Sequence, residues 1–363
     1  MLKIKLHTVQ DMGDLEFLDL VYSKLDIIYH PSLIELLEIN SPITVVLNMN
    51  YIENNVEHIS KFIQKSDENK LIILNLCETQ MSNEYVLTMF MKEHDSNPWF
   101  HLYTAYKNKR ISIIGLGESD PDINFVNVEY CQQLTATYDN IAVALNTFDD
   151  IYNIKNKPYK FLFLNNKPRL HRLDLINKLQ YQNLLTDALW TNISAGVKLP
   201  DHYPDVFFDE DKSRKIGITT YNYGSWGDGI LLPELYTDTY FSVITETNYD
   251  TPKTCFSEKI YKALLVGHPF IAVSSYKFYK ALKNRGYKTF DHLVDESFDD
   301  ISDNSDRLSA VVDSINELCS QDLNKFLDNA RLICKHNQLR FLEEMGELPE
   351  RNYNLLMNFF NKI

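Results

Sequence analysis

A serine, a glutamate and a lysine stand in a row at the start of a predicted helix. Segment 256–270 reads FSEKIYKALLVGHPF, in which Ser257 suits the N-cap and Gly267 the position just past the helix end. The free N–H groups and positive dipole end of such a helix favour an anion, and Lys259 adds a positive charge. The carboxylate of Glu258 suits recognition of hydroxyl groups, as on a sugar. The alternative is an amphipathic helix whose Glu and Lys are solvated.

Two arginines begin a second predicted helix. Segment 165–173 reads NNKPRLHRL and follows the apolar run 159–164, and Arg169 and Arg172 share a helix face because they are three residues apart. Two cations at a helix start repel one another and the helix dipole. A bound phosphate would remove that conflict, since guanidinium groups hold phosphate in a bidentate manner. The alternative is a basic exposed turn. His171 between the two arginines is either a third donor or, as we expect, a polar residue on the other face.

Other motifs carry weaker signals. The Asp-x-Asp sequences at 120–122 and 209–211 have the form that holds Mn²⁺ or Mg²⁺ with a diphosphate, but both also fit acidic loops. We therefore predict no metal and no cofactor. Segment 221–229, YNYGSWGDG, offers Tyr223 and Trp226 for stacking on a base or sugar in a moving lid. A surface loop with buried aromatics is an equal alternative for this segment.

Overall charge and composition exclude several classes of protein. The 363 residues include 50 Asp and Glu against 36 Lys and Arg, a net charge of -14, which opposes general binding to nucleic acids or anionic membranes. The five cysteines form no C-x-x-C pair, which excludes zinc-ribbon and thioredoxin-type sites. The longest apolar stretches are far shorter than the ~20 residues that span a bilayer. We therefore expect a soluble, cytoplasmic protein without a membrane span, in the host cytoplasm if a phage or virus encodes it.

The elements that must position these residues follow an α/β pattern. Short apolar runs at 44–47, 71–76 and 111–114 alternate with helical patterns, which predicts a parallel sheet covered by helices. The polar segment 149–157 punctuates the chain, and the same pattern restarts after it. We expect two Rossmann-like domains facing across a cleft, with a C-terminal helix docking on the first domain. The expected ranges are 1–155 for the acceptor-side domain, 156–345 for the donor domain and 346–363 for the last helix.

Two separated blocks carry a resemblance to a known family. The block NNKPRLHRLDLINKL at 165–179, followed by TET and SEKIYKALLVGHPFIAV, resembles the nucleotide-sugar-binding half of GT-B glycosyltransferases. The nearest similarity is to the α1,3-fucosyltransferase and exostosin-like group, with related bacterial and phage proteins, over about 159–290. The resemblance implies that an arginine of the first block and Lys259 contact the donor diphosphate, and that Glu258 contacts donor hydroxyls. The donor-binding residues expected from these blocks are Arg169, Arg172, Thr245, Glu246, Ser257, Glu258 and Lys259.

The predicted activity is transfer of a sugar from a nucleoside-diphosphate sugar to an unidentified glycan, protein or base, without a metal. An inverting displacement needs a general base, which we expect at the carboxyl end of a buried strand in the first domain. Glu78 follows the run 71–76 and is the first choice, and Glu118 after the run 111–114 is the second. One alternative is a non-catalytic viral or accessory binding or assembly module on a GT-B-like fold. Another is a DNA-base glycosyltransferase.

Overall fold

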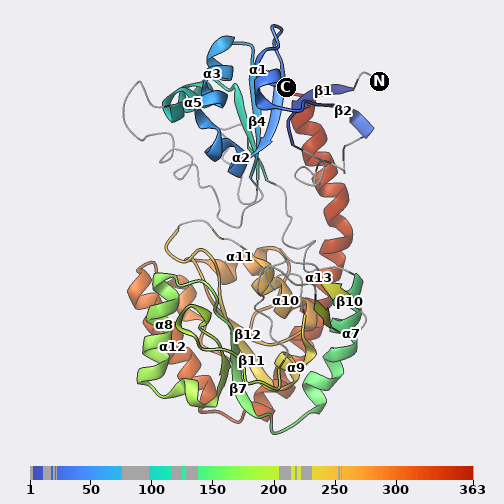
Figure 1. The fold of residues 1–363 in the computed structure, drawn as a ribbon. Helices are drawn as coiled ribbons and strands as arrows, with labels where there is room; N and C mark the ends of the chain where they lie inside the picture. The colour runs from blue at the N-terminus through green and yellow to red at the C-terminus, as the bar shows by residue number, and fades with distance from the viewer. Residues whose placement is uncertain are drawn as a thin grey trace. The chain divides into compact units, whose positions relative to one another are not determined.

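The computed structural model divides the chain into two compact units (Figure 1). The first unit comprises residues 1–130 and 347–363, and the second comprises residues 131–346. The structure describes residues 3–10, 18, 21, 23–75, 98–115, 125–127, 138–203, 214–216, 219–221, 231–251, 254 and 256–362. Each unit has its own parallel sheet and its own helices. Both units therefore belong to the α/β class and are consistent with a Rossmann-like fold.

The first unit is built on a six-stranded sheet in the order β2-β1-β3-β4-β5-β6, and every neighbouring pair is parallel. The predicted runs at 44–47, 71–76 and 111–114 correspond to its three central strands. The strands are β1 (Ile4–Thr8), β2 (Leu25–Tyr29), β3 (Thr44–Asn48), β4 (Lys70–Asn75), β5 (Ile111–Gly115) and β6 (Phe125–Asn127). The helices are α1 (Leu33–Leu37), α2 (Met49–Asn54), α3 (Val56–Lys65) and α5 (Pro98–Lys107).

The central strands of this sheet are buried on both faces. Along β4, Ile73 belongs to a core that includes α1, α2, α3 and α5, whereas Ile72 belongs to a core on the opposite face. That second core contains Leu356, Phe359 and Phe360, which come from the end of the long helix α13 (Leu323–Phe360). Continuous apolar runs are typical of parallel strands that are covered on both sides. The first unit is thus completed by residues that lie more than two hundred positions later in the chain.

The second unit contains a four-stranded parallel sheet in the order β12-β11-β7-β8. Its strands are β7 (Tyr159–Phe163), β8 (Ala188–Trp190), β11 (Thr239–Thr245) and β12 (Phe270–Val273), and β9 (Arg214–Ile216) and β10 (Thr219–Tyr221) form a separate antiparallel pair. Its helices are α7 (Tyr138–Asn153), α8 (Leu170–Tyr181), α9 (Pro233–Thr237), α10 (Glu258–Val266), α11 (Phe278–Asn284), α12 (Asn304–Cys319) and most of α13. Helices α8 and α12 lie side by side, and α7 packs beside α10 and α9 (Figure 1).

The order of these four strands defines a switch point between β7 and β11. From β7 the chain crosses through α8 to β8 on one side, and from β11 it crosses through α10 to β12 on the other side. Right-handed crossovers in opposite directions place their helices on opposite faces of the sheet. Ligands of open α/β sheets bind beyond the carboxyl ends of the strands at such a point. The fold therefore directs attention to the residues that follow β7, β11 and β12.

The division between the units lies at residues 130 and 131, not at the predicted position near 155. Segment 149–157 is the end of α7 and the turn after it, and Ile151 and Tyr152 on that helix are buried in the core of the second unit. The Tyr152 hydroxyl also donates a hydrogen bond to Gly267 O at 2.8 Å. Asp149, Asp150 and Asn153 lie on the exposed face of this amphipathic helix, which explains why the sequence suggested a domain boundary here.

Among the described residues, no helix is both long enough and apolar enough to cross a lipid bilayer.

The end of α10 depends on a glycine. Gly267 has φ +72°, and its N–H donates to Ala263 O, so the helix ends in a left-handed residue as the sequence predicts. A Cβ atom at this position would lie 2.6 Å from two ring carbons of Phe148. Gly196 has a similar φ of +78°, but a Cβ atom there would meet nothing within 4 Å. A comparison of substitutions at the two glycines therefore separates the cost of left-handed backbone strain from the cost of steric crowding.

We predict that Gly267→Ala lowers the free energy of unfolding by about 3 kcal/mol, through left-handed strain and overpacking against Phe148. Gly196→Ala should cost only about 1 kcal/mol, because it adds strain without crowding. Urea denaturation of both variants and the parent protein measures the difference. Equal costs for the two variants would contradict the close approach to Phe148.

Candidate functional site

The ends of β7 and β11 are tied together by side-chain hydrogen bonds. The Thr245 hydroxyl at the end of β11 donates to Asn165 Oδ1 at 2.7 Å. Asn165 follows β7, and its backbone N–H and carbonyl both bond the Thr191 hydroxyl, at 2.9 and 3.1 Å. All three residues are buried. The switch point is therefore a fixed polar surface, which we call the carboxyl edge: the residues directly after β7, β8, β11 and β12.

Arg172 lies beneath this edge rather than on an exposed face. Its side chain is 5% exposed, and its guanidinium donates to Lys167 O at 3.3 Å and to Thr245 O at 3.2 Å. It thus joins the loop after β7 to the end of β11. The premise that Arg172 shares an exposed face with Arg169 is wrong, because Arg169 is the N-cap residue of α8 and Arg172 is turned into the core. Arg172 positions the edge and is already engaged by the protein.

Arg169 keeps the position that an anion-binding residue requires. It is half-buried at the start of α8, with extended backbone. No described residue forms an ion pair or a side-chain hydrogen bond with its guanidinium. Of the two arginines that the sequence singles out, Arg169 is therefore the one placed to meet a ligand.

His171 packs into the edge as a neutral ring. Its Nε2 lies 3.1 Å from Glu246 O, and its ring lies parallel to Tyr249 with centroids 5.0 Å apart. Burial, and next the charge of the adjacent Arg172, lower the pKa of His171 to about 4. Because a carbonyl is only an acceptor, Nε2 carries the proton and donates it to Glu246 O. The structure thus places His171 in packing rather than as a free donor toward a ligand.

The start of α10 forms a compact network around a buried carboxylate. Ser257 caps the helix, as the sequence predicts, by accepting a hydrogen bond from the Lys259 N–H. Its own hydroxyl and N–H donate to the two oxygens of Glu246, at 2.5 and 3.3 Å. Glu246 is completely buried, and this desolvation raises the pKa of its carboxyl to about 6 against the opposing effects of Lys259 and Ser257. Glu246 therefore titrates close to neutral pH.

The lysine in this network is shared between acidic groups. Lys259 Nζ pairs with a carboxylate oxygen of Glu258 and lies 3.4 Å from the Ser257 hydroxyl. The Glu258 side chain is 7% exposed and that of Lys259 is 26% exposed, so both stand at the boundary between protein and solvent. One ammonium beside two carboxylates offsets one of their two negative charges, and carboxylate oxygens are acceptors for hydroxyl groups. The arrangement suits a polar ligand that carries hydroxyls.

The carboxyl edge also contains buried polar groups that the protein leaves unsatisfied. Asn165 Nδ2, Asn248 Nδ2, Ser274 Oγ and Ser275 Oγ have no hydrogen-bond partner among the described residues. Each of these residues is at most 9% exposed, and they follow three adjacent strands, β7, β11 and β12. A buried polar atom without a partner costs about 1–3 kcal/mol, so such atoms normally indicate a bound ligand or an ordered water. All four atoms can donate a hydrogen bond, which fits acceptor oxygens.

A second buried arginine also forms hydrogen bonds to residues at the carboxyl edge. Arg307 on α12 donates to Ser274 O at 3.2 Å and to Tyr249 O at 2.9 Å, and its guanidinium lies 4.5 Å from the centre of the Tyr249 ring. It is 2% exposed. Sequence reasoning missed Arg307, Asn248, Ser274 and Ser275 because each lies outside the two blocks that it singled out. The only feature of the sequence that could have identified these residues is their position, directly after a predicted strand or at a helix start.

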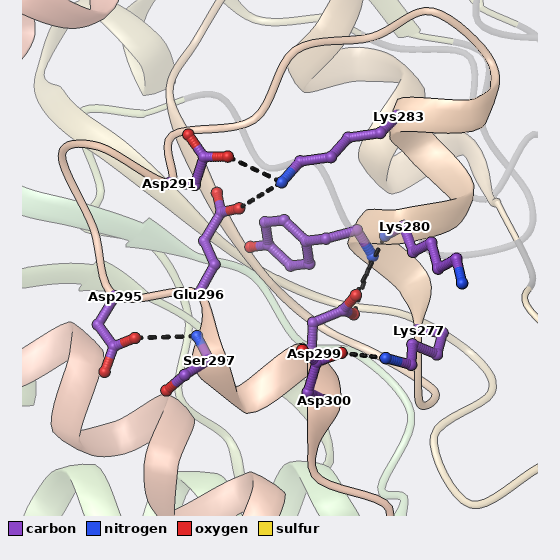
Figure 2. Close-up of a pocket in the computed structure, with 10 residues that line it drawn as sticks. Lys277, Lys280, Lys283, Asp291, Asp295, Glu296, Ser297, Asp299 and Asp300 are labelled. Atoms are coloured by element: carbon purple, nitrogen blue, oxygen red, sulfur yellow. Dashed lines mark hydrogen bonds and ion pairs between the residues drawn. The ribbon is translucent and has the colours of Figure 1, made fainter.

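A hollow of about 510 Å³ in the second unit lies beside α11 and contains none of the described residues that the sequence assigns to the donor site. Figure 2 shows that two of its lysines are turned toward acids: Lys277 pairs with Asp300, and Lys283 pairs with Asp291 at 2.9 Å. Asp299 accepts from the first N–H groups of α11. These contacts fix α11 against the following loop, and we assign the hollow no ligand.

Several predicted residues lie outside the part of the chain that the structure describes. These are the candidate bases Glu78 and Glu118, the stacking residues Tyr223 and Trp226, and the Asp-x-Asp motifs at 120–122 and 209–211. Their roles stay predictions. Within the described ranges, no group of three or more His, Cys, Asp or Glu side chains could hold a metal ion.

No model of a known protein family matches the chain, and no curated protein matches it significantly.

We predict that stability becomes less dependent on pH when Glu246 is replaced by Gln. Because the pKa of Glu246 is raised in the folded state, its proton stabilises the fold fully below pH 4.5, and this contribution is lost as the pH rises through about 6. The parent protein should therefore lose about 2 kcal/mol relative to Glu246→Gln across this range. Chemical denaturation at several pH values measures the difference. The control is Glu317→Gln on an exposed face of α12, and parallel curves for the parent and Glu246→Gln would refute the prediction.

Proposed function

We propose that the second unit binds a nucleoside-diphosphate sugar at the carboxyl edge and that the protein is a glycosyltransferase. The observation that carries the proposal is the set of unsatisfied buried groups on Asn165, Asn248, Ser274 and Ser275 at the switch point. Phosphate and sugar oxygens would accept hydrogen bonds from these groups and remove the cost of their burial. The resemblance of segments 165–179, 245–247 and 257–273 to the donor half of GT-B enzymes supports the same assignment.

The charges around the edge support transfer without a metal. In the reaction, the bond from the anomeric carbon to the diphosphate breaks, and the electron pair leaves with the diphosphate. Arg169 and Lys259 stand at the starts of α8 and α10, where helix dipoles also favour negative charge. Together they would stabilise the leaving group. Glu258 beside Lys259 would accept from hydroxyls of the sugar.

The domain arrangement of a GT-B enzyme belongs to this proposal too. Each unit has a parallel sheet with a switch point, and residues 347–363 join the first unit. These features support an assignment of donor binding to the second unit and acceptor binding to the first.

One observation favours a second candidate, a non-catalytic binding module. Lys259 is paired with Glu258, and Arg172 is engaged by backbone carbonyls, so two of the three predicted cations already have partners in the protein. A module that binds a neutral hydroxylated ligand would need no further positive charge. Turnover of a nucleotide sugar separates the two candidates.

We predict that a nucleoside diphosphate or its sugar raises the melting temperature. At a hundredfold excess over Kd, the shift should be about 5 °C, because the ligand binds only the folded state. A panel of UDP, GDP, ADP and their common sugars tests this by thermal denaturation. Arg169→Ala should weaken binding about tenfold, as expected for loss of one charged contact, whereas Lys288→Ala, on an exposed loop, should not. A panel without any response would refute donor binding.

We predict opposite effects of Ser275→Ala on stability and on binding. Removing a buried hydroxyl that lacks a partner should leave the stability of the free protein unchanged or slightly raised, while the affinity for the best nucleotide falls. Thr191→Val is the contrasting variant: Thr191 is satisfied by two hydrogen bonds, so its loss should cost about 1–3 kcal/mol. Denaturation and calorimetric titration give the two readouts. A clear loss of stability in Ser275→Ala would show that its hydroxyl is satisfied within the protein.

We predict that sugar transfer survives EDTA, because Arg169, Lys259 and two helix starts supply positive charge at the edge. The measurement is release of nucleoside diphosphate before and after chelation. Complete loss of turnover, with recovery on adding Mn²⁺, would instead favour the Asp-x-Asp motif at 120–122 as a metal site.

A further inference from the structure

The first sheet has a switch point of its own, between β1 and β3. From β1 the chain passes to β2 on one side, and β3 then pairs with the other side of β1. Ligands of such sheets bind beyond the carboxyl ends of the two strands that flank this point. The residues that occupy this place are His7 and Thr8 at the end of β1, Gln10 after it, and Asn48 at the end of β3.

These strand ends are held by a small buried network. Gln10 Oε1 accepts from the Asn48 N–H at 2.6 Å, and the Gln10 N–H donates to the Thr8 hydroxyl at 3.1 Å. Thr8 is fully buried and Gln10 is 6% exposed. The backbone of the edge strand continues the network, because the His30 N–H donates to Thr8 O at 2.8 Å. The switch point thus has a rigid frame on which a side chain can be positioned.

Two histidines on this frame share a hydrogen bond. His7 Nδ1 and His30 Nε2 are 2.9 Å apart, and the two rings are within 14° of parallel with centroids 5.2 Å apart. The centroid separation exceeds the N–N distance by about two ring radii, which is the geometry of rings lying side by side in one plane. The rings are therefore joined through a nearly linear N–H···N bond rather than stacked face to face.

The hydrogen bond between the two rings fixes the orientation of His30, the less buried of the two histidines. His7 is 7% exposed, and burial, followed by the charges of His30 and Lys5, lowers its pKa below the usual 6.5, with Asp26 opposing. In the tautomer in which His30 Nε2 carries the shared proton, a neutral His7 accepts it at Nδ1, and the Nδ1 lone pair of His30 can accept another proton. His30 is half-buried, and no described residue forms a hydrogen bond to its Nδ1.

We propose that the His7–His30 pair is the proton-accepting site for a hydroxyl ligand bound at the β1–β3 switch point. His30 is the catalytic residue and His7 is the positioning residue. This inference rests on the proposed function, in which an acceptor oxygen attacks the anomeric carbon of the donor. As the new C–O bond forms and the bond to the diphosphate breaks, the hydroxyl proton passes to His30 Nδ1. His7 stabilises the resulting imidazolium by accepting from its Nε2–H.

The first test changes His30 while keeping its contact with His7. In His30→Gln, the side-chain amide still donates toward His7 Nδ1, but the group that accepts the proton is gone. Release of nucleoside diphosphate from the best nucleotide sugar, with a mixture of methyl glycosides as acceptors, should fall by about 10²-fold. The affinity for the nucleoside diphosphate should not change. The control is His58→Gln on the exposed side of α3, which should keep full turnover.

The second test distinguishes a role of His7 in orienting His30 from a role in packing alone. His7→Asn retains an acceptor atom near the place of Nδ1 and should keep most of the turnover, whereas His7→Ala should lose it and move the acidic limb of the pH–rate profile. A purely structural role would lower turnover equally in both variants without moving that limb.

A third measurement does not depend on turnover. In NMR titrations of the imidazole resonances, His30→Gln should raise the pKa of His7, because the repulsion between two protonated rings is removed.

Normal turnover in His30→Gln, or a His7 pKa that does not change in this variant, would overturn the inference while donor binding stands. A parent protein that binds no nucleotide and turns over no nucleotide sugar would overturn the proposed function, and with it the catalytic role of the pair.

Discussion

The guanidinium of Arg172 is the interaction on which the arrangement of the second unit depends. It donates to carbonyls of the loop after β7 and of the last residue of β11, and these two strands flank the switch point. The carbonyl of Thr245 lies at the buried end of β11, where a backbone acceptor without a donor costs free energy. Because a cation supplies the donors, the strand ends are joined beneath the surface, and the groups above them are free to face a ligand.

The electrostatics of the edge centre on the buried carboxyl of Glu246. Burial raises the pKa of this carboxyl, and Lys259 and Ser257 oppose that rise. Glu246 in turn orders Ser257, which caps α10 and places Lys259 and Glu258 at the boundary with solvent. Positive and negative groups therefore alternate across the site. Such a surface discriminates by the pattern of a ligand's charges and hydroxyls rather than by net charge.

The sequence predicts the elements of this structure better than the environments of its side chains. The apolar runs, the Ser257 cap and the Gly267 helix end follow local rules, and the structure confirms each of them. The sequence predicts a domain boundary in segment 149–157 instead, because local composition does not reveal that one face of a helix is buried.

The same limit applies to the site residues. Spacing alone places Arg169 and Arg172 on one helix face, but it does not show that one is an N-cap and the other is buried. The unsatisfied groups of Asn165 and Ser275 are not visible in the sequence at all, since lacking a partner is a property of the tertiary structure. The His7–His30 bond joins residues of neighbouring strands and likewise appears only once the sheet is formed.

The return of α13 to the first unit has a consequence for how the protein forms during synthesis. Leu356, Phe359 and Phe360 are part of the core under β3, β4 and β5, yet the ribosome makes them after the entire second unit. Until they emerge, the core on that face of the first sheet lacks three of its apolar residues. The second unit, whose residues are continuous in the chain, can bury its own core earlier. The unit made first is thus the one completed last, and this incompletely covered sheet face is the surface that a chaperone would need to protect in the interval.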